Sequence, residues 1–335
     1  MSTSDVLASV VLDEAAATFA SVVATVESVF VTPRPDVVTV AVACLVAGGH
    51  LLVEDLPGMG KTTLAKALAG ALGLDMRRLQ CTADLLPADA IGAMVLDPRD
   101  GQPHFRPGPV FTNVLVADEL NRASPRTQSA LLEAMEERQV SVDGTTAALP
   151  RPFMVIATQN PFDMAGTSLL PHSQRDRFLA RIALGYPGPE HELALLAGNG
   201  GTPGLVDLAP AVTPAELAAL MQAAAGVHSS SVLLRYVYDL VSATRVHPTI
   251  AVGASPRAAL ALLAAARSVA VSRSRPYVTP DDVQVMAVPV LAHRVLLEPG
   301  AEHSGEDAES LIGEVVASVP VPSPERASPP PDRLA

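Results

Sequence analysis

The sequence is poor in aromatic residues and in lysine. Its 335 residues contain no tryptophan, and aromatics make up only 3% of the chain. Hydrophobic residues nevertheless reach 49%, which is ample for a core of alanine, valine and leucine in one large or two smaller domains. Lys61 and Lys66 are the only lysines among 23 basic residues, so arginine carries nearly all of the positive charge.

Cysteine is also scarce, and the chain has no excess of positive charge. Cys44 and Cys81 are the only cysteines, and no spacing of cysteine and histidine is typical of a metal site. We therefore expect two reduced, buried thiols in a cytoplasmic protein. The net charge of −12 argues against non-specific nucleic-acid binding as the main task, although a local basic patch stays open.

No segment is typical of a signal peptide or of a membrane span. The first residues are acidic and polar, without a basic segment followed by an apolar one. The longest apolar stretch, residues 37–53, contains Gly48, Gly49 and His50. It is better explained as a buried helix that turns at the two glycines into a strand than as a membrane helix.

A glycine-containing loop between a strand pattern and a helix pattern carries the clearest functional signal. Residues 54–63 read Glu-Asp-Leu-Pro-Gly-Met-Gly-Lys-Thr-Thr, after an apolar run and before a helical run. This order is typical of a phosphate-binding loop, whose backbone N–H groups and following helix N-terminus hold phosphate oxygens. We expect Lys61 to reach the β- and γ-phosphates of ATP, and the Thr62 hydroxyl to bind Mg²⁺. A chance glycine-rich turn is the alternative, but it would not explain the flanking strand and helix.

The loop departs from the usual motif at one position, where Asp55 replaces the first glycine. Gly58 and Gly60 remain at the positions where the chain must approach phosphate closely. The residues expected to bind the nucleotide are Asp55, Leu56, Pro57, Gly58, Met59, Gly60, Lys61, Thr62 and Thr63.

Two further apolar strands end in polar residues that complete the expected site. Residues 114–117 lead into Asp118 and Glu119, and residues 153–158 lead toward Asn160. Asp118 would join the Mg²⁺ shell, and Glu119 would polarise the attacking water. Asn160 would contact the γ-phosphate or hold that water, although by itself it fits a loop-capping role equally well.

Taken together, the motifs resemble the MoxR family of AAA+ ATPases. The resemblance runs from about residue 15 to about residue 297. It implies an α/β P-loop AAA+ domain with a parallel sheet, followed by a C-terminal all-α lid domain. The segments that carry it are 108–113, 117–123, 127–140, 157–161, 176–178, 253–257 and 290–294.

The resemblance assigns a role to each polar residue of the expected site. Asp118 and Glu119 match the Walker B pair, and Asn160 matches sensor 1. Arg177 matches the arginine finger, which acts on a nucleotide held by a neighbouring subunit, and Arg257 matches sensor 2. The resemblance also implies a nucleotide bound in the cleft between the ATPase core and the lid.

The arginine assignment leaves alternatives open. The family usually has leucine where this chain has Arg175, so two arginines lie near the expected contact between subunits. Arg122 is a third and weaker candidate. The resemblance further implies a homo-oligomer, most often a hexameric ring, and a protein partner that carries a von Willebrand factor A domain.

The chain divides into four expected regions along its length. In the lid, Thr213, Ser255 and Thr279 each precede a proline and are expected helix starts. The expected regions are an N-terminal helix packing on the core (1–34), the ATPase core (35–188), the helical lid (189–297) and an acidic, then proline-rich tail, largely disordered (298–335).

Two Asp-Gly pairs, at residues 100–101 and 143–144, predict β-hairpins. Simple surface turns are the alternative. Their positions resemble the two insertions of the AAA+ branch that contains MoxR and the magnesium chelatase ATPase subunit. The flanking segments expected to pair are 93–96 with 104–105, and 140–142 with 145–148.

The leading functional prediction is a Mg²⁺-dependent ATP hydrolase that acts as an oligomeric AAA+ chaperone on protein complexes. A magnesium-chelatase-like motor subunit is the nearest enzyme alternative, because it shares the two hairpins. A nucleic-acid helicase is disfavoured by the acidic balance. A nucleotide-dependent switch with little turnover is disfavoured because Glu119, Asn160 and Arg177 are all present.

Overall fold

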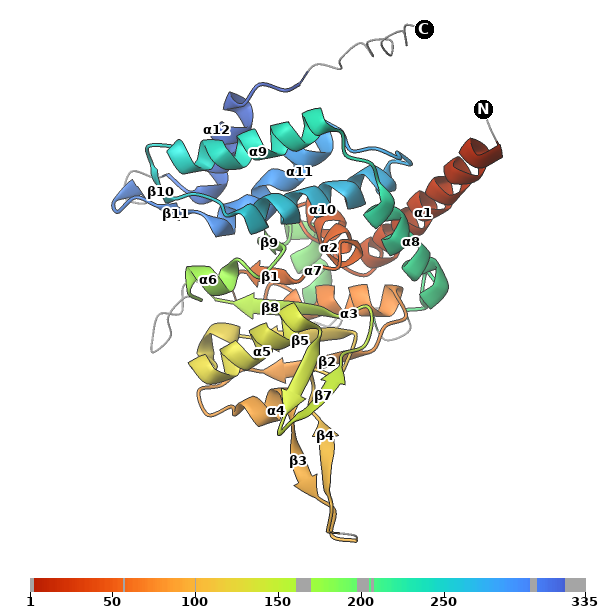
Figure 1. Ribbon diagram of the computed structural model, residues 1–335, viewed down its shortest axis with the longest axis vertical. Helices are drawn as coiled ribbons and strands as arrows, with labels where there is room; N and C mark the ends of the chain where they lie inside the picture. Colours follow the sequence, from red (N-terminus) through yellow and green to blue (C-terminus); the bar gives the residue numbers. More distant parts are fainter. Residues whose placement is uncertain are drawn as a thin grey trace, which may run out of the picture.

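A five-stranded parallel sheet forms the centre of the ATPase core (Figure 1). The structure is a computed structural model that describes residues 3–56, 58–99, 101–160, 170–197, 205, 208–301 and 306–322. In spatial order the strands are β2 (Met76–Gln80), β5 (Val114–Asp118), β8 (Met154–Gln159), β1 (Leu51–Glu54) and β9 (Ala180–Ile182).

The register of the sheet brings the expected site residues to one edge. Ala157 of β8 lies between Leu52 of β1 and Ala117 of β5. The carboxyl ends of these three parallel strands are therefore neighbours. Ligands of open α/β sheets bind at this edge.

Helices cover both faces of the sheet, and this explains why its strands are apolar on both sides. Leu51 and Val53 point into a core beneath α1, α2 and α3, whereas Leu52 and Val155 point into a second core beneath α5. The helical elements that precede α8 (Pro214–Gly226) are α1 (Thr3–Glu27), α2 (Asp36–Val46), α3 (Lys61–Ala71), α4 (Pro87–Ile91), η1 (Leu120–Arg122), α5 (Pro125–Glu137), α6 (His172–Arg175) and α7 (Pro189–Ala197).

Both predicted hairpins are present. β3 (Gly92–Leu96) pairs antiparallel with β4 (Pro103–Pro107), and β6 (Gln139–Val142) pairs antiparallel with β7 (Thr145–Ala148). The β3–β4 hairpin projects away from the body (Figure 1). Its base is tightly closed, because a Cβ on Gly92 would lie 2.4 Å from the main-chain oxygen of Arg106. Asp100, at its predicted turn, lies outside the described residues.

The predicted lid is confirmed as helical, and its three predicted helix starts are present. It is not all-α, because two short strands, Ile250–Val252 and Leu296–Leu297, pair within it. Ser255 Oγ accepts a hydrogen bond from Ala258 N at 3.2 Å, and Thr213 and Thr279 begin capping boxes. The lid elements are α8 (Pro214–Gly226), α9 (Ser231–Val246), β10 (Ile250–Val252), α10 (Pro256–Ser272), α11 (Pro280–Leu291), η2 (Ala292–Arg294), β11 (Leu296–Leu297) and α12 (Ala308–Ser318).

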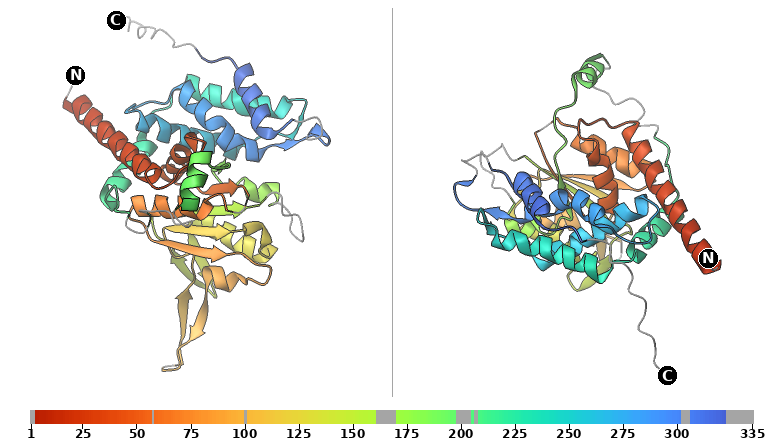
Figure 2. Two further views of the ribbon diagram at one scale, coloured as in Figure 1. Left: turned by 180° about the vertical axis from the view of Figure 1, so that it is seen from behind. Right: turned by 90° about the horizontal axis from the view of Figure 1, so that it is seen from above.

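The N-terminal helix does more than pack on the core. α1 contacts α2 and α3 of the core, and it also contacts α8 and α10 of the lid. Its N-terminal part extends beyond the body of the molecule (Figure 2). No helix among the described residues is long and apolar enough to cross a membrane.

The expectation of a largely disordered tail from residue 298 is wrong for α12. The Asp307 side chain caps this helix by accepting from Ser310 N at 2.8 Å, and Leu311, Ile312 and Val315 are buried against the lid. The acidic composition masked this apolar stripe, whose spacing is helical. The proline-rich end of the chain lies largely outside the described residues.

Candidate nucleotide-binding site

The loop between β1 and α3 depends on two glycines. Gly58 and Gly60 have φ angles of +86° and +88°, a conformation that residues with a side chain rarely adopt. Lys61 follows at the first position of α3 and donates from Nζ to the main-chain oxygen of Asp55. Pro57 lies outside the described residues. The loop therefore presents backbone N–H groups and the N-terminus of α3 to the same space, as phosphate binding requires.

The aspartate that replaces the usual first glycine fastens this loop to the rest of the core. One oxygen of Asp55 accepts from Leu56 N at 2.8 Å. The other accepts from Leu184 N at 2.7 Å and from Gly185 N at 2.8 Å. These two residues follow β9 and lead toward α7. The unusual residue thus ties the phosphate loop to the connection between the core and the lid.

The residues predicted to hold phosphate, metal and water line one pocket of about 350 Å³, which we call the phosphate pocket. Asp55, Leu56 and Met59 are not among its lining residues, and Met59 packs against the apolar core instead. The phosphate pocket is lined by Gly58, Gly60, Lys61, Thr62, Thr63, Arg78, Gln80, Asp118, Glu119, Thr158 and Asn160.

The oxygens in the phosphate pocket fit a magnesium ion. Asp118 is only 6% exposed, and its carboxylate accepts from Thr158 Oγ1 at 3.2 Å and from Arg78 Nε. With the Thr62 hydroxyl it supplies hard oxygen ligands, which Mg²⁺ prefers. The described residues contain no cluster of three or more metal-binding side chains. Phosphate oxygens and water would complete the shell of an ion held by Thr62 and Asp118.

Glu119 stands where the backbone turns sharply after β5. Its φ angle is +54°, and its N–H donates to Thr158 Oγ1 at 2.9 Å. Its Oε2 atom accepts from Gln80 Nε2 at 3.2 Å and from Arg122 Nη1 at 3.0 Å. A left-handed non-glycine residue is strained, and such strain is concentrated at functional sites. Arg122, the third arginine-finger candidate, therefore contacts the glutamate of its own chain.

Burial and the neighbouring carboxylates act on Lys61 in opposite directions, and burial has the larger effect. Burial lowers the pKa of Lys61, while the nearby carboxylates of Asp55, Asp118 and Glu119 raise it. The ammonium group thus sits among negative charges and remains available for phosphate oxygens.

Arg78 and Gln80 were not predicted as part of the site. Both lie on β2, the strand beside β5, and each bonds one of the two acidic residues, Asp118 or Glu119. The sequence signal that could have identified them is the short strand pattern before Cys81. Pairing of that strand with β5 brings both side chains beside the Walker B residues.

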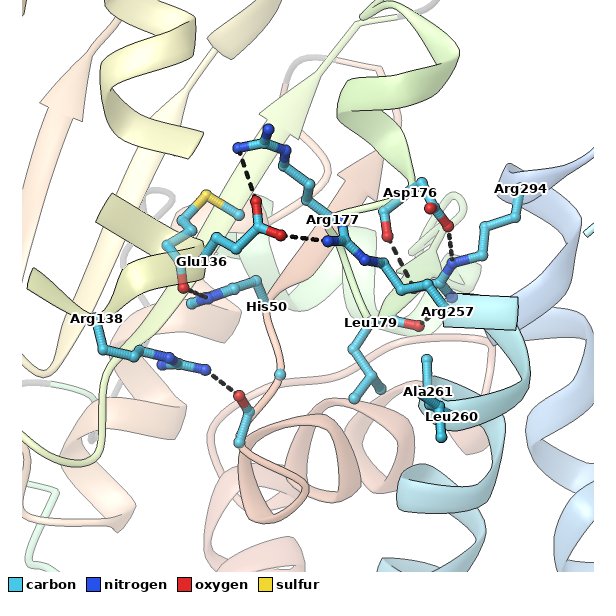
Figure 3. A pocket seen from close by; sticks show the side chains of 13 residues that line it. His50, Glu136, Arg138, Asp176, Arg177, Leu179, Arg257, Leu260, Ala261 and Arg294 are labelled. Carbon is cyan, nitrogen blue, oxygen red and sulfur yellow. Dashed lines mark hydrogen bonds and ion pairs between the residues drawn. The ribbon is translucent and has the colours of Figure 1, made fainter. Parts of the chain in front are cut away.

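Arg177 and Arg257 lie apart from the phosphate pocket, on a second hollow of about 360 Å³ (Figure 3). Arg177 follows α6 in the core, and Arg257 lies in the first turn of α10 in the lid. Both pair with Glu136 near the end of α5: Arg177 Nη1 lies 3.3 Å from Oε2, and Arg257 Nη2 contacts Oε1. We call this group of three residues the arginine surface.

A buried contact supports the arginine surface from behind. Arg294 of the lid is 2% exposed and donates to the Asp176 carboxylate at 2.9 Å and to Leu179 O at 2.9 Å. Ser255 Oγ also donates to Asp176, at 3.3 Å. Burial lowers the pKa of Arg294, and Asp176 raises it. Asp176 is the residue before Arg177, so two lid residues fix the place from which Arg177 projects.

Arg175, the alternative arginine finger, has a different environment. Its Nε atom is buried and has no hydrogen-bond partner among the described residues. Burial lowers its pKa, whereas the nearby Glu54 raises it. Arg175 is not among the residues that line the hollow shared by Arg177 and Arg257.

The sheet, the phosphate loop and the helical lid together define a P-loop nucleotide-binding protein of the AAA+ class. Residues 50–180 match the family model described as the ATPase family associated with various cellular activities (AAA). Residues 242–315 match the AAA lid domain, and this match includes most of α12.

Relatives of known name or structure cover most of the chain. YeaC of Bacillus subtilis (strain 168) is 42% identical over 289 residues, which span 86% of this chain and 90% of YeaC. Chaperone MoxR1 of Mycobacterium tuberculosis is 41% identical over 289 residues, which span 83% of this chain and 76% of MoxR1. The crystal structure of a candidate ATPase from Cytophaga hutchinsonii superimposes with a TM-score of 0.87 and 33% identity, covering 96% of this chain and all of that one. The chain belongs to the MoxR family of AAA+ ATPases.

Proposed function

We propose that this chain is a Mg²⁺-dependent ATP hydrolase that works as an oligomer and remodels or matures protein complexes as a chaperone. The main support is the phosphate pocket, which Lys61, Thr62, Asp118 and Glu119 line together. A phosphate loop, a carboxylate for the metal and a second carboxylate for water are the parts that phosphoryl transfer to water requires.

In this proposal Thr62 and Asp118 hold Mg²⁺, which supplies charge neutralisation at the phosphates when bound. Arg78 bonds the same Asp118 carboxylate through its Nε atom. Lys61 exchanges its bond with the Asp55 main-chain oxygen for a phosphate oxygen.

Glu119 is the proposed base that orients and polarises water. Gln80 and Arg122 both bond its Oε2 atom, which leaves Oε1 to accept a hydrogen bond from the attacking water. Asn160 lines the same pocket and would hold that water or the γ-phosphate.

Arg177 is the proposed arginine finger for a neighbouring subunit, and Arg257 is its companion. Neither lines the phosphate pocket of its own chain, and both reach the same surface from separate parts of the fold. The planar fork of arginine matches phosphate oxygens well. A ring, hexameric by analogy with the family, would place this surface against the nucleotide of the next subunit.

The proposed partner is a protein with a von Willebrand factor A domain, bound through the hairpins. The β3–β4 hairpin supports this, because it projects from the body and exposes Val95 and Leu96. The same hairpins favour the second candidate, a magnesium-chelatase-like motor subunit. Replacing each hairpin turn with a short Gly-Ser turn should spare basal hydrolysis and weaken partner stimulation. Duplex DNA that stimulates hydrolysis, with no protein doing so, would contradict the chaperone proposal.

Mixing two inactive variants tests the contact between subunits. Lys61→Ala removes phosphate binding, and Arg177→Ala removes the finger, so each alone should be inactive. Mixed rings contain interfaces where an intact Lys61 faces an intact Arg177, and phosphate release should partly recover. Absence of recovery at every ratio, with mixed rings demonstrated by differently tagged subunits, would overturn the trans role of Arg177.

A further inference from the structure

One carboxylate holds both arginines of the arginine surface (Figure 3). Each oxygen of Glu136 takes a different partner: Oε2 takes Arg177 and Oε1 takes Arg257. Glu136 belongs to α5 of the core, while Arg257 belongs to α10 of the lid. The contact therefore links three separate elements through a single side chain.

The other acidic groups nearby are accounted for differently. Asp176 lines the same hollow, but its carboxylate is taken by Arg294 and Ser255. Glu137, the next residue of α5, is exposed and forms no ion pair among the described residues. Glu136 is thus the one carboxylate among the described residues that pairs with either arginine.

Carboxylate and phosphate oxygens are both strong charge-assisted partners for a guanidinium group. Each carboxylate oxygen of Glu136 therefore contacts a guanidinium group at a place where a phosphate oxygen could bind instead. The side chains of Glu136, Arg177 and Arg257 are 37%, 32% and 48% exposed. Ion pairs with this much solvent are weak and easily exchanged. The hold on the two arginines is consequently reversible.

We propose that Glu136 is an internal competitor for the phosphate of a neighbouring subunit. It keeps Arg177 and Arg257 together and occupied until a nucleotide-loaded neighbour displaces it. This inference rests on the proposed trans role of the two arginines. Displacement opens the contact between Arg257 and the core, while the buried Arg294–Asp176 contact remains. The contact between the lid and the core at Arg257 therefore depends on whether the neighbouring subunit holds a nucleotide.

Assembly in the presence of ATP and Mg²⁺ tests this competition without hydrolysis. The Glu119→Gln background keeps ATP bound, and sedimentation velocity gives the protein concentration at half-assembly. Glu136→Gln keeps the shape of the side chain but removes its charge. We expect half-assembly at a concentration about fivefold lower than in the background alone, which corresponds to about 1 kcal/mol. Glu137→Gln, on the same helix, removes the same charge and should leave the concentration unchanged.

The outcomes separate this inference from the proposed function. Arg177→Ala in the same background should weaken assembly, and that result supports the trans role. If Glu136→Gln then assembles no better than Glu137→Gln, the competition by Glu136 is overturned while the trans role stands. If Arg177→Ala assembles normally, the trans role itself fails. Should Glu136→Gln not fold, Glu136→Asp serves instead, because its shorter reach cannot span both arginines. Assembly of that variant at the background concentration would also overturn the competition.

Discussion

The phosphate pocket and the arginine surface balance their charges in different ways. In the phosphate pocket each acidic residue has a basic partner of its own: Arg78 bonds Asp118, and Arg122 bonds Glu119. On the arginine surface two guanidinium groups share the single carboxylate of Glu136. The phosphate pocket also contains the phosphate-binding loop. The arginine surface has no such loop, and its two positive charges exceed the one negative charge of Glu136. The first suits a bound nucleotide, and the second suits an anion delivered by another subunit.

The largest expected effect is a difference between two variants of the phosphate pocket, one that changes ATP affinity and turnover and one that changes turnover alone. Lys61→Ala should weaken both ATP binding and turnover, because it removes a charge that contacts phosphate. Glu119→Gln should still bind ATP but lower turnover by roughly 10²-fold or more, since it removes the base. Phosphate release and fluorescent-nucleotide titration measure the two quantities.

Lys66→Ala is the matched control for this experiment. Lys66 is the other lysine of the chain, lies on the same helix as Lys61 and is exposed. Its removal should leave binding and turnover unchanged. Wild-type turnover in Glu119→Gln would show that the catalytic assignment is wrong.

A smaller effect decides to which nucleotide Arg257 belongs. Arg257→Ala should lower turnover of the assembled protein by roughly tenfold and leave ATP affinity of the separate subunit unchanged. The exposed lid residue Arg235, whose side chain contacts Asp239 and Tyr238 of its own helix, provides the control substitution Arg235→Ala. Weaker ATP binding by isolated Arg257→Ala subunits would mean that this arginine serves its own pocket.

Much of the phosphate pocket was predictable because its signals are local. A motif of a few residues is enough to identify the glycines of the phosphate loop and the acidic residues at the end of β5. The same is true of the two Asp-Gly turns of the hairpins. Glu136 had no such signal, because its role depends on Arg177 and Arg257, which are distant in the sequence. The same holds for Arg78, which becomes a partner of Asp118 only through the pairing of β2 with β5. α12 was missed because acidic residues hid its three buried apolar positions.

The smallest expected effect concerns the buried histidine behind the arginine surface. His50 accepts from Val155 N at 2.9 Å on Nδ1, and its Nε2 donates to Met135 O at 3.1 Å. Burial, assisted by Arg138, lowers the pKa of His50 from 6.5 to about 3. As the pH falls below 6.5, only the unfolded chain gains this proton, so stability is lost progressively toward pH 3.

Urea unfolding at pH 7.5 and at pH 5.5 measures this loss. His50 should contribute about 1.4 kcal/mol of destabilisation over this interval. His50→Gln should remove that contribution, while the part due to the second buried histidine, His293, remains. An identical pH dependence in wild type and variant would show that His50 is not held neutral in the folded protein.

The larger apolar core has a thermodynamic consequence for the whole chain. It runs without interruption from Val53 and Ile156 of the sheet, through Phe19 of α1, to Leu262 and Met286 of the lid. Two domains that share one core cannot melt independently, because unfolding either one strips apolar surface from the other. We therefore expect a single calorimetric transition for core and lid. ATP is held by a loop of the core, but it should raise the melting temperatures of the core and of the lid by the same amount.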